Sequence, residues 1–171
     1  MPPDTHTTIP PAYTGPGLVD LQVNGYAGLD FTGNPEAWTP QAWHAAREKM
    51  WARGVRMALP TFITNAPDRM VAQAHAFRAL VEGDTELAAF FPKAHIEGPF
   101  ISPETGPRGA HALQHCTLPK DQPALIDRIQ EASGGRVGMV TLAPELPGAV
   151  ALTRHLAEQG GRGLPPDQKR L

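Results

Sequence analysis

The stretch "TPQAWHAAREKMWARGVRMALPTFITN", residues 39 to 65, predicts a helix followed at once by a buried strand. It opens with a threonine suited to the N-cap and a proline suited to the first helical position. Trp43, Ala46 and Met50 recur at the spacing that places them on one helical face, and Gly54 ends the helix. The apolar and β-branched residues that follow favour a strand. This stretch therefore contains one α-to-β step of an alternating fold.

The same alternation extends in both directions along the chain. We expect strands at 18–25, 55–65, 87–98 and 136–145, and helices at 39–54, 66–83, 120–135 and 146–160. Strands that alternate with helices at this spacing favour parallel βαβ units, either in a doubly wound sheet or in a (β/α)8 barrel. A complete barrel needs roughly 250 residues, so four units make about half of one.

Composition narrows the class of protein. The 171 residues are 41% hydrophobic and carry a formal net charge of −2, which suits one globular core and gives no basic surface for nucleic acid and no membrane-binding segment. We therefore expect a small molecule as partner, with no nucleic acid and no membrane. The single cysteine, Cys116, excludes an internal disulfide framework. The first residues lack the order of a signal peptide, which predicts a cytoplasmic protein.

Polar residues gather where the predicted strands end, and this is the ligand-binding end of both parallel architectures. They are Gln22 and Asn24, Thr61 and Thr64, Glu97, and Glu145. Within "AHIEGPFIS", residues 94 to 102, a carboxylate ends an apolar strand and a Gly-Pro turn follows. An unpaired buried charge costs several kcal/mol, so Glu97 needs a positive partner, and a metal ion is one candidate.

Four motifs carry a resemblance to a known family. They are "PGLVDLQVNGYAGLDF" (16–31), "LPTFITN" (59–65), "HIEGPFISPETGPRGAH" (95–111) and "VTLAPE" (140–145). In order and spacing they resemble the N-acetylglucosamine-6-phosphate deacetylases of the amidohydrolase superfamily, from about residue 16 to 160. The first motif is common to many amidohydrolases, whereas "HIEGPF" followed by "GAH" is far more specific.

The resemblance implies the roles of five residues. Glu97 would be the metal ligand of a site that holds one divalent ion, Zn or Fe, per subunit. Gln22 and Asn24 stand where other amidohydrolases have the histidines of a second metal, which favours a single-metal site. Ala110 and His111 match the substrate-contacting pair.

The resemblance also implies an activity and an architecture. Family members hydrolyse N-acetyl-D-glucosamine 6-phosphate to D-glucosamine 6-phosphate and acetate, with an activated water as nucleophile and an aspartate as general base. The resemblance implies that the intact enzyme is a homodimer. The part that matches this chain would be a partial (β/α)8 TIM barrel of about four βα units. Two histidine ligands and the aspartate would lie on strands beyond these four, so we expect the chain alone to be incomplete and inactive.

The expected organisation has three parts. Residues 1–15 read as an extended or disordered lead-in, residues 16–160 as the N-terminal half of the barrel, and residues 161–171 as an irregular tail with the character of a truncated or frameshifted end. Two other functions stay open. One is an amidohydrolase of another specificity, dihydroorotase-like or isoaspartyl-dipeptidase-like. The other is a non-catalytic half-barrel that binds a partner through its exposed sheet edges.

Several residues keep two interpretations. Glu97 can instead pair with Lys93 or Arg108 as a structural group. His95 lies on the same strand face as Glu97, and it can be a core residue or a group behind the site, or equally a site residue itself. Glu145 can line the site or stabilise a strand end. The histidines on helices or in the loop, at 44, 75, 115 and 155, are expected to pack or face solvent.

Overall fold

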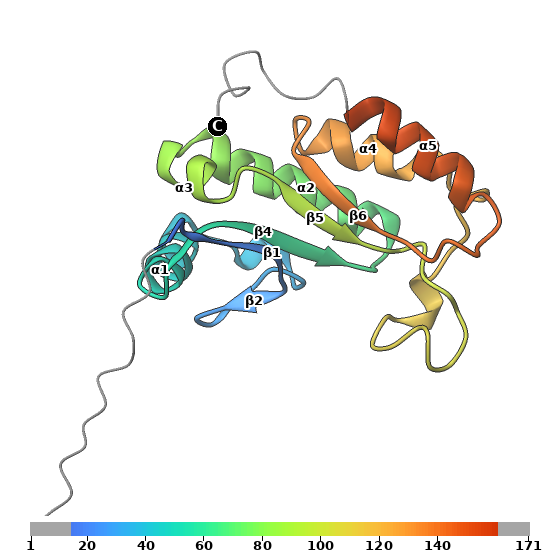
Figure 1. The fold of residues 1–171 in the computed structure, drawn as a ribbon, viewed down its shortest axis with the longest axis horizontal. Helices are drawn as coiled ribbons and strands as arrows, with labels where there is room; N and C mark the ends of the chain where they lie inside the picture. The colour runs from blue at the N-terminus through green and yellow to red at the C-terminus, as the bar shows by residue number, and fades with distance from the viewer. Residues whose placement is uncertain (1–14, 161–171) are drawn as a thin grey trace, which may run out of the picture.

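The computed structural model describes residues 15–160. The expected lead-in, except for its last residue, and the expected tail at 161–171 lie outside the described residues. Within the described range the protein is an α/β structure built on one larger sheet, with helices packed beside its strands (Figure 1).

The sheet consists of four parallel strands that neighbour one another in chain order. They are β1 (Leu18–Val23), β4 (Val55–Ile63), β5 (Ala94–Glu97) and β6 (Val137–Thr141). A doubly wound sheet would contain a reversal of strand order, and these four strands show none. All four end at the same edge of the sheet, as the sequence predicts.

The helices between these strands also follow the predicted alternation. They are α1 (Pro40–Trp51), α2 (Pro67–Glu82), α3 (Thr85–Phe90), α4 (Leu125–Ala132) and α5 (Ala149–Gly160), with short 3-10 turns η1 (Pro35–Ala37) and η2 (Leu113–His115). The predicted start of α1 is confirmed, because the Thr39 side chain accepts a hydrogen bond from the Ala42 N–H at 3.2 Å. Its predicted apolar face of Trp43, Ala46 and Met50 is buried.

The predicted strand at 87–98 is wrong in its first half. Residues 85 to 90 form α3, and the strand is confined to β5. The Asp84 carboxylate accepts from the N–H groups of Glu86 and Leu87, both at 3.0 Å, and so caps a helix that the apolar run alone does not reveal. Pro92 then separates the helix from the strand.

A small hairpin, which the sequence pattern does not indicate, follows β1. It pairs β2 (Gly25–Tyr26) with β3 (Leu29–Asp30) in antiparallel fashion. The other predicted elements are present but shorter: the fourth strand ends at Thr141 rather than 145, and the helices expected at 120–135 and 146–160 begin at Leu125 and Ala149.

An aromatic cluster joins α1 to its neighbours. The ring of Trp43, fully buried, has the ring centroids of Phe31, Phe91, Trp38 and Phe77 at 4.9, 5.1, 5.4 and 5.7 Å. These distances suit edge-to-face and tilted aromatic pairs. The cluster ties the segment after β3, the two long helices and the end of α3 into a single core.

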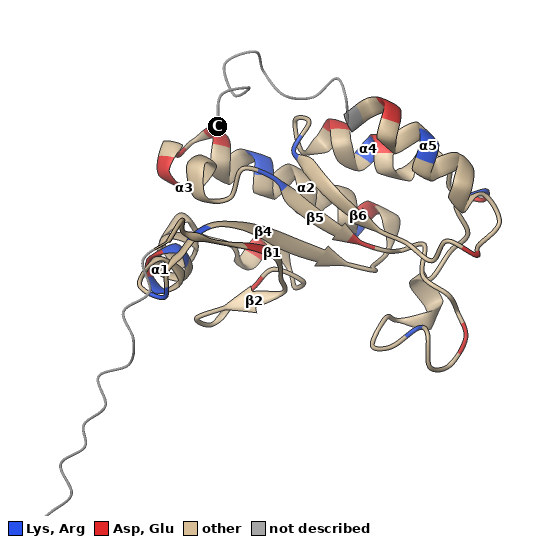
Figure 2. Cartoon of the chain, in the orientation of Figure 1, with Lys and Arg blue, Asp and Glu red and all other residues tan. Residues whose placement is uncertain are grey.

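Charge is sparse along the large sheet. Its strands contain three charged residues, Asp20, Arg56 and Glu97, whereas both signs occur on the helices and loops (Figure 2). Of these three residues, Glu97 is the one at the carboxyl end of its strand.

Three apolar side chains of the edge strand β1 are exposed, namely Leu18, Val19 and Leu21. Within residues 15–160, none of the helices has the length and apolar character needed to cross a membrane.

The N-cap of α1 gives a stability prediction. Thr39→Ala removes the hydroxyl that binds the Ala42 N–H, and this should lower the free energy of unfolding by about 1 kcal/mol. Thr105→Ala, at an exposed loop position, is the matched control and should change stability by less than about 0.5 kcal/mol. Urea unfolding followed by circular dichroism measures both, and equal effects of the two substitutions would contradict the capping role.

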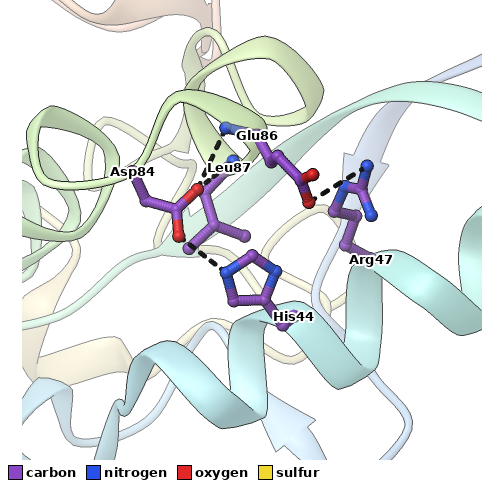
Figure 3. A network of polar contacts seen from close by, with 5 residues as sticks. All are labelled: His44, Arg47, Asp84, Glu86 and Leu87. Atoms are coloured by element: carbon purple, nitrogen blue, oxygen red, sulfur yellow. Dashed lines mark hydrogen bonds and ion pairs between the residues drawn. The ribbon is translucent and has the colours of Figure 1, made fainter.

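A polar network joins α1 to α3 (Figure 3). The Nε2 atom of His44 lies 2.6 Å from Oδ2 of Asp84, while Arg47 lies 3.5 Å from the carboxylate of Glu86. The N–H of Leu87 and the His44 ring both favour ionised Asp84, so the pKa of this carboxyl lies below its ordinary value of 3.8.

This network predicts an acid-dependent loss of stability. Because folding lowers the Asp84 pKa, its contribution is complete above the pKa of the unfolded state and is lost as pH falls through the folded-state value. Asp84→Asn keeps a capping oxygen but removes the charge. We expect the wild-type chain to be more stable than this variant near neutral pH, and the difference to fall as pH drops below 3.8 and to vanish below the folded-state pKa of Asp84. A pH-independent difference in denaturant unfolding would show that the charge is irrelevant.

Candidate active site

Glu97 is the last residue of β5, and its side chain is mostly buried, with 19% exposed. The two cations considered as structural partners bind elsewhere: Lys93 donates to the Gly135 carbonyl at 2.7 Å, and Arg108 donates to the Pro103 carbonyl at 3.1 Å. His111 is the ionisable group that forms an ion-pair contact with Glu97, because its Nε2 lies 3.9 Å from Oε1 of the carboxylate. The structure thus brings together two of the predicted site residues.

The turn after Glu97 depends on a glycine. Gly98 has a φ of +90°, and a Cβ added there would overlap the hydroxyl of Thr64. Its N–H donates to the Thr141 carbonyl at 2.9 Å, which ties the turn to the end of β6. The absence of a side chain lets the segment after β4 approach the segment after β5 closely.

Thr64 connects the two predicted groups. Its Oγ1 lies 2.7 Å from Nδ1 of His111 and 3.3 Å from the backbone carbonyl oxygen of Glu97. Thr64 is buried, with 4% exposed, immediately beyond the end of β4. The contact fixes the ring of a loop histidine against two strand ends. The sequence predicts Thr64 at the ligand-binding edge but indicates no partner for its side chain.

His95 is a core residue of the sheet. It is fully buried, with Nδ1 3.3 Å from the hydroxyl of Thr61 and Nε2 2.8 Å from the hydroxyl of Thr141. It therefore joins the three strands β4, β5 and β6 on the face that carries Glu97. Burial lowers the pKa of the His95 ring, against the opposing effect of the Glu97 charge.

The other predicted site residues are more exposed. Gln22 lies near the end of β1, and Asn24 is the first residue after that strand. Both are exposed, and so is Ala110, in the loop directly before His111. Among the hydrogen bonds and ion pairs within residues 15–160, none joins these three residues to Glu97. The backbone N–H of Gln22 donates to the Asp20 carboxylate at 3.1 Å, so Asp20 orients the chain at the end of β1.

The remaining candidates lie away from Glu97. Glu145 is exposed and lies beyond Thr141, where β6 ends, so its expected place at a strand end is wrong. Nε2 of His155, on α5, lies 2.8 Å from the carboxylate of Asp127, on α4. His75, on α2, is exposed. Burial raises the pKa of the half-buried Cys116 thiol. These residues do not contact Glu97.

The donor set suits part of a metal site. A carboxylate and an imidazole are ligand types that Zn and Fe accept. Among the ion pairs of residues 15–160, the one basic side chain near the partly buried Glu97 carboxylate is His111, at 3.9 Å. Across the described part of the chain, no three His, Cys, Asp or Glu side chains gather closely enough to hold a metal ion. Structural and catalytic zinc sites use three or four protein ligands. Glu97 and His111 alone therefore cannot form a complete zinc site.

Comparisons with known proteins agree with the motifs. The chain is 30% identical over 152 residues to an N-acetylglucosamine-6-phosphate deacetylase of Caenorhabditis elegans, covering 85% of this chain and 34% of that protein. It is also 30% identical over 151 residues to an N-acetylgalactosamine-6-phosphate deacetylase of Escherichia coli O157:H7, covering 86% of this chain and 37% of that protein. No protein-family model matches the chain.

A solved structure gives the same result. The crystal structure of N-acetyl-D-glucosamine-6-phosphate deacetylase from Mycobacterium smegmatis matches with a TM-score of 0.71 and 29% identity, covering 85% of this chain and 38% of that one. This chain resembles one part of the N-acetylglucosamine-6-phosphate deacetylases. The resemblance expected from the motifs is therefore confirmed, and the chain spans about a third of the length of the deacetylases it matches.

The turn at the deacetylase-like "HIEGP" motif gives a further prediction. Gly98→Ala should destabilise the chain through both backbone strain and overlap with Thr64, whereas Gly28→Ala tests strain alone, because Gly28 has the same φ of +90° and open space around it. We expect about 1–2 kcal/mol at Gly28 and about 1–3 kcal/mol more at Gly98. Chemical unfolding measures the difference, and equal losses at the two glycines would refute the close approach.

Proposed function

We propose that this chain is part of a metal-dependent deacetylase that hydrolyses N-acetyl-D-glucosamine 6-phosphate to D-glucosamine 6-phosphate and acetate. The observation that carries the proposal is the convergence of Glu97 and His111 at the carboxyl ends of parallel strands. Both residues belong to the most specific of the motifs shared with the deacetylases. A non-catalytic module would not need a carboxylate and an imidazole to meet at this edge.

The proposed architecture is a partial (β/α)8 barrel over residues 16–160. Strand order supports it, because β1, β4, β5 and β6 neighbour one another in chain order with a helix between each pair. The face that carries His95 and Glu97 would then be the inner face of the barrel. The strands that complete such a barrel would follow β6.

Each residue at the strand ends has a proposed role. Glu97 would hold one divalent ion, Zn or Fe, which supplies a Lewis acid for amide hydrolysis when bound. His111, with Ala110 before it, would contact the sugar. Gln22 and Asn24 are neutral amides in place of ligands for a second ion, which supports a single-metal site. Two further ligands and the general base would come from outside these residues, and the assembled enzyme would be a cytoplasmic homodimer.

A chimera tests the proposal. Residues 1–160 would be joined to the part of the Mycobacterium smegmatis deacetylase that follows the matched segment, and acetate release from N-acetyl-D-glucosamine 6-phosphate would be measured with Zn²⁺ present. We expect activity in the chimera and none in the 171-residue chain alone. Activity in the isolated chain would mean that the site is complete without further strands.

Substitution of the proposed ligand sharpens this test. Removing a group behind a metal ligand costs about 10–100-fold in affinity or activity, so Glu97→Gln in the chimera should lower kcat/KM by at least about 100-fold. Glu158→Gln, at an exposed position on α5, is the control and should have no effect. Zinc content should fall with Glu97→Gln alone. Full activity of a Glu97→Gln chimera that keeps its zinc would refute the assignment.

N-acetyl-D-galactosamine 6-phosphate is a second candidate substrate. The Escherichia coli O157:H7 relative is named an N-acetylgalactosamine-6-phosphate deacetylase, and it is as similar to this chain, at 30% identity, as the Caenorhabditis elegans relative. The same chimera should be assayed with N-acetyl-D-galactosamine 6-phosphate. A higher kcat/KM for this epimer would move the proposed specificity from the gluco to the galacto configuration without changing the reaction.

A further inference from the structure

The hydroxyl of Thr64 faces two groups at once. Its Oγ1 lies 3.3 Å from the Glu97 carbonyl oxygen and 2.7 Å from Nδ1 of His111. A carbonyl oxygen accepts and cannot donate, and a hydroxyl carries one proton. If that proton pointed to His111, two oxygen lone pairs would face each other at the carbonyl. The arrangement that satisfies both contacts has the hydroxyl donating to Glu97 and accepting from Nδ1–H of the ring.

This hydrogen bond decides which nitrogen of a neutral His111 carries the proton. With Nδ1 protonated, Nε2 has a free lone pair, because a neutral imidazole holds one ring proton. Nε2 is the atom that lies 3.9 Å from the Glu97 carboxylate. With the opposite tautomer, Nε2–H would point a donor at Glu97 and compete with any cation for that carboxylate.

We propose that Thr64 is a positioning residue that holds His111 as the Nδ1–H tautomer, so that Nε2 is presented as a hydrogen-bond acceptor and Glu97 stays free to bind a cation. The inference rests on the proposed function for its purpose, since the ligand that donates to Nε2 would be a sugar hydroxyl beside the metal. The tautomer itself depends only on the contacts of Thr64.

The surroundings support a fixed rather than a mobile contact. Thr64 is buried with 4% exposed, and the His111 side chain is 15% exposed. Gly98 leaves the space that the Thr64 hydroxyl occupies. At the start of the loop that carries His111, the Phe100 carbonyl accepts from the Ala143 N–H at 2.7 Å, which anchors the loop to the segment after β6.

Nitrogen NMR of the histidine rings tests the proposal without substrate or activity. The full chain would be labelled with ¹⁵N histidine and studied at a pH where the rings are neutral, and His111→Gln would assign the signals of His111 among the seven histidines. We expect a pyrrole-like Nδ1 and a pyridine-like Nε2 in the wild-type chain. A wild-type ring with protonated Nε2 would overturn the proposal directly.

Two substitutions separate the hydroxyl from the shape of the side chain. Thr64→Val removes the acceptor at nearly constant volume, and the Nε2 signal should move toward the pyrrole-like region as the ring shifts to the other tautomer. Thr64→Ser keeps the hydroxyl and should retain the wild-type pattern. If the valine variant does not fold, Thr64→Ala serves the same purpose.

The outcomes distinguish this inference from the proposed function. An unchanged His111 tautomer in folded Thr64→Val would refute the positioning role even if the chimera is an active deacetylase. Conversely, the predicted tautomer change in an inactive chimera would uphold the role of Thr64 and reject the deacetylase activity. The ring signals of His44 and His155, which bind carboxylates elsewhere, should not change in any of these variants.

Discussion

The pairing of β4 on both of its edges is the constraint on which the rest of the structure depends. β4 lies between β1 and β5, so its backbone orders both neighbours. Its side chains then serve two faces: Phe62 is fully buried in the hydrophobic core, and Thr61 contacts His95 on the face that carries Glu97. The strand also delivers Thr64 to the edge where the candidate site lies. Core and site are therefore positioned by one strand.

The candidate site is assembled from turns rather than from a single element. β5 supplies Glu97, the turn after β4 supplies Thr64, and a loop residue, His111, reaches back to both. The long loop between β5 and α4 is held by backbone hydrogen bonds, including one from the Thr117 N–H to the Pro99 carbonyl at 3.1 Å. In such an arrangement the polar residues of a site lie on the loops at the carboxyl ends of parallel strands, while the strands themselves remain apolar.

Local sequence pattern was sufficient where local forces decide the structure. The α1 helix, its Thr39 cap and its buried face follow from adjacent residues, and Glu97 at the end of an apolar strand follows from alternation. The strand predicted over the run before β5 is wrong because a short apolar segment fits helix and strand alike, and the side chain of Asp84 decides between them. The contact between Thr64 and His111 joins residues 47 positions apart, so no periodicity could indicate it.

One irregularity in the sheet bears on the order in which the chain comes apart. The pairing of β1 with β4 shifts register between Asp20 and Val23, and Pro60, which has no N–H to donate, stands opposite Val23. The outer strand is thus attached by an interrupted ladder, and much of its apolar surface faces solvent. Backbone amides of β1 would exchange with deuterium earlier than those of β5, and the strand that carries Gln22 would detach before the strand that carries Glu97.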